Sequence, residues 1–298
     1  MRVLFYTPEG PVAKAGLADV AVPAGRSVAV AVNDYVLRRP VLAAEVSATR
    51  GRVVAWKHEL RHDPAGSGGS LSLGAAAAAP DWYFPDGALG PGYDERISVL
   101  NPSDREAIVT ITLSSSERVV QPPELVELSL PPLTSREIAL RRSVPQPGSA
   151  IAVGAVVRSI NGVEVVAGRT VAYLERARRG LAAETGAARS ARLWRLGPVV
   201  GRPERDTVVI LNPGHRGASI RIALLNPGGA PLAPRSLQDI RVPAGRAVRV
   251  AVERWTGGGP AAAEVEATGS VVAERFAYSS RDEDAAAAMG MALRSPDG

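Results

Sequence analysis

The chain has 298 residues, of which 46% are apolar and 22% are charged, so it is long enough for two to three small domains with cores of their own. The absence of cysteine excludes disulfide scaffolds, thiolate zinc sites and cysteine nucleophiles, and no apolar run is long enough to span a membrane. The formal net charge is +5, but nearly all basic residues are scattered Arg, and no basic stripe with stacking aromatics is present. We therefore expect no specific nucleic-acid partner.

Three landmarks recur along the chain at a spacing of about 110 residues. They are a Leu-Asn-Pro run, a Val-Pro-Ala-Gly-Arg step and a Val-Val-Ala run, which begin at Leu100 and Leu211, at Val22, Leu130 (as Leu-Pro-Pro-Leu-Thr) and Val242, and at Val53, Val165 and Val271. The agreement of the three spacings predicts three units, with boundaries at 1–78, 79–190 and 191–298.

Each unit is expected to be built of β-strands. Residues 106–113, 219–225 and 246–252 alternate apolar and other side chains and are rich in Val, Ile and Thr. The Asn-Pro runs at Asn101 and Asn212 have turn chemistry and are interpreted as hairpin connections. Short strands with frequent turns predict an all-β fold of tandem immunoglobulin- or fibronectin-like antiparallel β-sandwich repeats.

The segments between the units have the composition of linkers or long edge excursions. Residues 63–80 and 176–192 are rich in Gly, Ser, Ala and Arg. Within the first of them, residues 75–79 could form one helical turn, and residues 282–293 near the C-terminus could form a short helix that Gly290 weakens.

The first unit is expected to be truncated, because residues 2–8 align with residues 221–227 and Met1 falls in the middle of a repeat. A half-sandwich leaves an apolar face and strand edges open. The main expectation is that the natural chain starts upstream and that a signal or membrane anchor was lost with those residues. The alternatives are that the remnant packs on the second unit, or that a partner donates the missing strands.

One catalytic motif matches literally, since residues His58 to His62 read His-Glu-Leu-Arg-His. A zinc hydrolase would need this run on a helix, where His58 and His62 reach one zinc and Glu59 polarises its water. The repeat places it on a closing strand instead, where the two imidazoles stand roughly 13 Å apart. A zinc hydrolase is therefore kept only as a remote alternative, and we assign no catalytic, cofactor or metal residue.

The few aromatic residues mark the heads of the units. Trp82 and Tyr83 open the second unit and Trp194 opens the third, which favours a role for these rings as core plugs. The alternative is a glycan-stacking surface, with Trp82, Tyr83 and the loop residue Trp255 as its contacts. In that case the chain would be a carbohydrate-binding or enzyme-accessory module.

The aromatic motifs, the Leu-Asn-Pro motif and the run Val272 to Tyr278 follow one another in this order along the chain. In this order they resemble the W-Y-F-x-x-G repeats of actinobacterial secreted or membrane-anchored proteins. These proteins form a family of unknown function of the DUF5719 type. The chain departs from the pattern after Trp194 and at Gly168-Arg169, where the third unit has Glu274-Arg275. The resemblance implies export to the cell envelope and no known activity or cofactor. We expect a non-enzymatic structural or interaction module of the envelope or extracellular space. It would reach a membrane only through an upstream anchor. An envelope glycan and another envelope protein are the two classes of partner left open.

Overall fold

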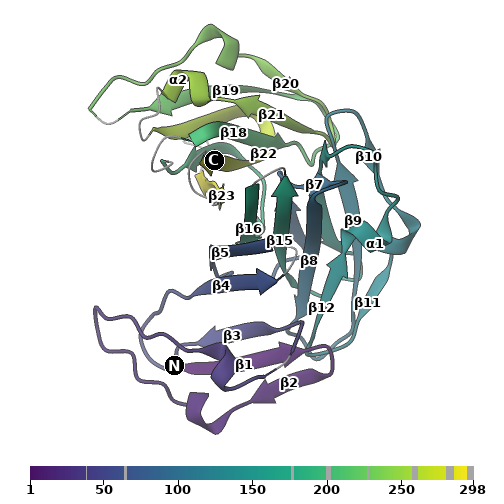
Figure 1. Ribbon diagram of the computed structural model, residues 1–298, viewed down its shortest axis with the longest axis vertical. Helices are drawn as coiled ribbons and strands as arrows, with labels where there is room; N and C mark the ends of the chain where they lie inside the picture. Colours follow the sequence, from purple (N-terminus) through teal and green to yellow (C-terminus); the bar gives the residue numbers. More distant parts are fainter. Residues whose placement is uncertain are drawn as a thin grey trace.

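The computed structural model describes residues 1–37, 39–63, 66–175, 178–198, 203–226, 228–256, 261–279 and 285–293. These residues form antiparallel sheets with a few single-turn helices, which confirms the all-β prediction. The specific immunoglobulin or fibronectin topology remains a prediction. In Figure 1 the chain follows a C-shaped path from the N-terminal strands through the second unit to the C-terminal strands. No helix in the described ranges is long and apolar enough to cross a membrane.

The N-terminal residues form a three-stranded sheet followed by a separate hairpin. The sheet has the order β2-β1-β3. Its apolar side packs around Phe5, Leu17 and Val36. It rests on the second unit, where the Ser135 hydroxyl donates a buried hydrogen bond of 2.8 Å to the carbonyl of Tyr6. The strands are β1 (Arg2–Thr7), β2 (Gly10–Ala13), β3 (Ala43–Ser47), and in the hairpin β4 (Trp56–Asp63) and β5 (Gly66–Leu73).

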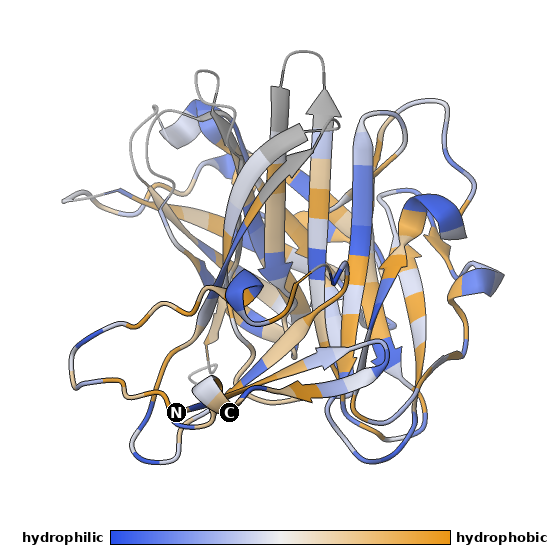
Figure 2. Cartoon of the chain, turned by 60° about the horizontal axis from the view of Figure 1, so that its bottom comes forward, coloured by the Kyte–Doolittle hydropathy of each residue, from blue (hydrophilic) through white to orange (hydrophobic). Residues whose placement is uncertain are grey.

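The second unit contains two sheets with its core between them. The first sheet has the order β10-β9-β14-β6, with β11 also paired to β9, and the second has the order β12-β8-β15-β16. Their strands are β6 (Asp81–Phe84), β8 (Tyr93–Asn101), β9 (Ala107–Ser114), β10 (Val119–Val120), β11 (Leu128–Leu130), β12 (Thr134–Ala139), β14 (Gly154–Ser159), β15 (Val166–Glu175) and β16 (Arg178–Thr185). A small pair joins β7 (Ala88–Leu89) to β13 (Ile151–Ala152). Apolar and polar bands alternate along many strands in Figure 2, as half-buried strands require.

The third unit uses one long strand in both of its sheets. The first part of β22 pairs with β17 and β19, and its last part pairs with β18 and β23. Its strands are β17 (Ala191–Leu196), β18 (Pro203–Leu211), β19 (Ala218–Leu225), β20 (Ile240–Val242), β21 (Ala247–Ala251), β22 (Ala262–Ser279), β23 (Ala285–Met289) and β24 (Met291–Leu293). The helices within the described residues are α1 (Leu140–Ser143), α2 (Glu253–Thr256) and the single 3-10 turns Ala15–Leu17, Val32–Asp34, Pro123–Leu125 and Arg235–Leu237.

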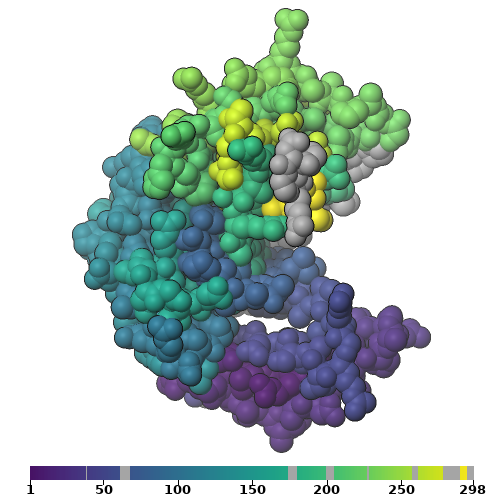
Figure 3. Space-filling model, turned by 180° about the vertical axis from the view of Figure 1, so that it is seen from behind, coloured from purple at the N-terminus to yellow at the C-terminus, as the bar shows by residue number. Residues whose placement is uncertain are grey.

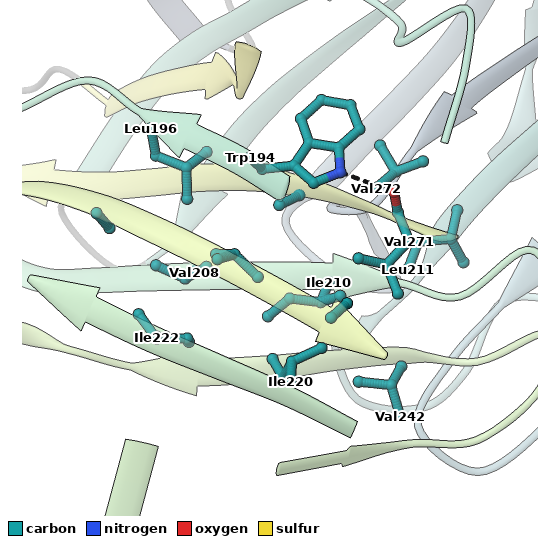
Figure 4. Packing of buried hydrophobic residues seen from close by; sticks show 14 of the residues in the cluster. Trp194, Leu196, Val208, Ile210, Leu211, Ile220, Ile222, Val242, Val271 and Val272 are labelled. Atoms are coloured by element: carbon teal, nitrogen blue, oxygen red, sulfur yellow. Dashed lines mark hydrogen bonds between the residues drawn. The ribbon is translucent and has the colours of Figure 1, made fainter. Parts of the chain in front are cut away.

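Positions related by the sequence repeat make the same hydrogen bonds. The Trp82 indole donates to the carbonyl of Val165 over 2.7 Å, and the Trp194 indole donates to that of Val271 over 2.8 Å (Figure 4). Each unit ends in a hairpin that we call its closing hairpin, formed by β4–β5, β15–β16 and β22–β23. At each of them the N–H of a glycine donates to an alanine carbonyl, in the pairs Gly74–Ala55, Gly186–Ala167 and Gly290–Ala273. At these positions the predicted repeat coincides with matching hydrogen bonds.

Several local expectations were wrong. The segments interpreted as linkers or long edge excursions are not linkers, because they hold strands β5 and β16, and the residues expected in a C-terminal helix form β23 and β24 where they are described. Residues 75–79 form no helical turn, and Ala79 instead bridges to Val165. The Asn101 and Asn212 turns do not close hairpins either, because β8 and β9 lie in different sheets, and β18 and β19 pair with different parts of β22 rather than with each other.

Candidate functional site

The aromatic candidates at the head of the second unit lie inside the protein. Trp82 is 2% exposed and Tyr83 is 7% exposed. The N–H of Tyr83 also donates to the carbonyl of Ala187, which holds this strand against the last residues of the second unit. These rings fit the core interpretation, and neither offers a face to a glycan.

Trp255 is the remaining aromatic candidate, and it lies in helix α2 rather than in a loop. Its ring is partly buried against the core of the third unit, and the guanidinium of Arg254 lies 4.0 Å from the ring centroid. The guanidinium of Arg254 therefore already occupies one face of the Trp255 ring.

The His-Glu-Leu-Arg-His run lies in strand β4, as the repeat predicts. His58 pairs in register with Leu71 and His62 with Ser67, so the chain lacks the helical turn that would bring both imidazoles to one metal. The side chain of His62 is outside the described residues. The side chains that the structure describes contain no group of three or more His, Asp or Glu suited to a metal ion.

Sequence reasoning missed a buried cluster of charged side chains between the second and third units. Its centre is Arg169 on β15, which lies directly across the hairpin from Glu184 on β16. The guanidinium Nη2 lies 2.5 Å from Oε1 of Glu184 and 2.8 Å from Oε1 of Glu274 on β22 of the third unit. All three side chains are at most 7% exposed, so one arginine joins two units inside the protein.

A second contact reinforces this junction. The backbone N–H of Asp86 donates to Oε2 of Glu274 over 3.0 Å. The carboxylate of Asp86 in turn pairs with the guanidinium of Arg249 on β21, which also donates to the carbonyl of Gly87 over 3.1 Å. The second and third units therefore each contribute an arginine and at least one carboxylate to the cluster.

Burial governs the titration of this cluster. Desolvation raises the pKa of Glu95 to about 8, although the nearby Arg169 and the N–H of Ala88, which donates to Oε2 over 2.7 Å, act in the opposite direction. Desolvation also raises the pKa of Glu184 well above its usual value and raises that of Glu274. Such carboxyl groups retain protons that exposed carboxyl groups have lost.

The third unit contains an ion pair at the positions equivalent to Glu95 and Arg169. There Arg275 forms a two-pronged pair with Asp206, with Nε at 2.7 Å and Nη2 at 2.5 Å from the two carboxylate oxygens. Both side chains are at most 2% exposed. In the second unit the corresponding arginine, Arg169, instead forms ion pairs with Glu184 and with Glu274 of the next unit. The repeat spacing does relate Arg169 to Arg275 and Glu95 to Asp206, which is the signal that could have located the cluster.

Comparisons with known proteins identify a family without a described activity. No curated protein matches the chain. A solved structure, titled "Crystal Structure of Thermotoga maritima 1070", has 15% identity and a TM-score of 0.31, with coverage of 35% of this chain and 96% of that one. Residues 69–290, which include the buried charge cluster and both tryptophan plugs, match DUF5719, a family of unknown function. The chain therefore belongs to the DUF5719 family.

Proposed function

We propose that the chain is a non-enzymatic structural or interaction module that holds its units at a fixed spacing. The observation that carries the proposal is the buried junction of Arg169 and Glu274, with Asp86 and Arg249 beside it. Buried ion pairs with several hydrogen bonds tolerate little change in geometry, because separating the partners leaves a charge in the interior without compensation. Such a junction suits a rigid spacer between an anchored end and a surface-presenting end.

The location of the module in the cell envelope or extracellular space is part of the proposal. It is supported by the resemblance of the repeats to exported proteins. Cell fractionation of the native host with an antibody against the chain tests it directly. Recovery in the envelope or the medium is expected, and recovery in the cytosol would contradict this location.

Rigidity can be measured by distance distributions between spin labels, because the chain has no cysteine of its own. Ser149→Cys in the second unit and Ser236→Cys in the third place labels at exposed positions. We expect one narrow distribution, and a broader one when Arg249→Met removes the partner of Asp86. A distribution that is already broad without Arg249→Met would refute the rigid-spacer function.

A further inference from the structure

The closing hairpins of the three units are arranged in series along the inner side of the C, with β5 against β16 and β16 next to β23 (Figure 1). The contact between β5 and β16 is intimate. The Ser70 hydroxyl accepts from the N–H of Ala183 over 2.7 Å and donates to its carbonyl over 3.1 Å. A Cβ at Gly68 would lie 2.6 Å from the backbone N of Leu181. One face of the first hairpin therefore covers the edge of the second hairpin.

The opposite face of the first hairpin is apolar and open. Trp56 pairs with Leu73 across the hairpin and His58 pairs with Leu71, so these side chains share a face, and Leu60 lies over Gly69. The large apolar residues of this face and of the segment leading into it are strongly exposed, at 74% for Val54, 53% for Trp56, 76% for Leu60, 63% for Leu71 and 64% for Leu73. We call this surface the hairpin patch.

The same position is covered in the other hairpins. Leu71 corresponds through the repeat to Ala183, which is 4% exposed because β5 lies on it. Trp56 corresponds to Glu274, which is fully buried by the hairpin of the second unit. The hairpin patch thus takes the position that a neighbouring hairpin covers in the second and third units, but its large apolar side chains require a partner face that is equally apolar.

From this arrangement we infer that the hairpin patch binds the hairpin patch of a second copy of the chain. The inference goes beyond the proposed spacer function and does not depend on it. Among the exposed large apolar residues of the described chain, this hairpin and the residues leading into it gather the largest group, so a second copy of the patch is the largest apolar face that this chain can offer as a partner. A patch that meets its own copy forms a two-fold interface, the commonest arrangement of homodimers.

The size of the patch is sufficient for such an interface. Its five side chains expose on the order of 600 Å², at the upper end of the largest apolar patches on monomers. Two copies would then bury roughly 1,200 Å², above the ~1,000 Å² that a specific interface needs. Figure 3 shows a hollow between the N-terminal residues and the rest of the chain.

Sedimentation velocity of the full chain at about 100 μM tests the inference. We expect a dimer that becomes a monomer in Leu60→Glu and in Leu71→Glu, which change opposite strands of the patch. The matched control is Leu37→Glu, because Leu37 is 71% exposed and lies outside the patch. Circular dichroism verifies that each variant is folded, and the high exposure of these leucines means that folding should not depend on them.

Two outcomes would overturn the inference. The first is a wild-type chain that is monomeric at this concentration. Binding of that monomer to insoluble cell-wall glycan, abolished by Leu60→Glu, would assign the patch to a glycan instead. The second is a dimer that both patch variants leave intact, which would place the interface elsewhere on the molecule.

Discussion

Arg169 and Glu274 are separated by 105 residues in the chain, yet their side chains form an ion pair of 2.8 Å at 2% and 0% exposure. Both groups have lost their hydration in the folded protein. Removing one partner therefore leaves the other buried without a compensating charge. Since the arginine belongs to the second unit and the glutamate to the third, the stability of the junction and that of the units are coupled.

Replacing Arg169 by Met should therefore be severely destabilising. It leaves Glu184 and Glu274 buried without their cation, which in other proteins costs about 3–5 kcal/mol of unfolding free energy. Urea unfolding followed by tryptophan fluorescence measures this cost. The matched control is Arg158→Met in the same unit, which removes an exposed pair of 2.7 Å to Asp81 and should cost about 0–1 kcal/mol. Equal losses in the two variants would show that the buried cluster does not stabilise the fold.

Most strands and the core could be predicted from the sequence, because local alternation and the repeat report on the same residues. Trp82 and Trp194 have equivalent positions and equivalent hydrogen bonds, so the repeat alone indicated a shared structural role. The strand over residues 66–73 could not be predicted from composition. Its glycines and serines resemble a linker, whereas at Gly68 and Ser70 small side chains are required by the close approach of β5 to the backbone of β16.

The charge cluster was missed for a different reason. A sequence pattern shows which residues are charged but not which of 30 acidic groups meets a given arginine. At Gly168-Arg169 the sequence shows only a departure from the Glu-Arg pair of the repeat. In the structure Arg169 has acquired a partner in the next unit, and this long-range pairing leaves no local signature.

The stability of the protein should fall as the pH rises from about 4.5 to about 8. The pKa of Glu95 is raised from its usual 4.5 to about 8 in the folded state, so within this range the folded chain binds a proton that the unfolded chain has released. Stability from this group is fully present below about pH 4.5 and is lost as the pH rises to 8, by up to about 1.4 kcal/mol per pH unit. The raised pKa values of Glu184 and Glu274 act with the same sign.

The variant Glu95→Gln isolates this contribution, because glutamine imitates the protonated carboxyl at every pH. Its unfolding free energy should decline less steeply between pH 5 and pH 8, and at pH 8 it should exceed that of the wild type. Denaturant unfolding at a series of pH values gives both slopes. Parallel slopes for the two proteins would contradict the assignment of this proton to Glu95.

Gly68→Ala should loosen the first hairpin from the second unit. The added Cβ would lie 2.6 Å from the backbone N of Leu181, and backbone cannot rotate away as a flexible side chain can. We expect a destabilisation of about 1–3 kcal/mol and faster hydrogen exchange at the N–H of Ala183, which donates to Ser70. The matched control is Gly148→Ala, where a Cβ meets nothing within 4 Å. If exchange at Ala183 is unchanged in Gly68→Ala, the hairpin does not depend on this close approach, and the serial contact between hairpins loses its support.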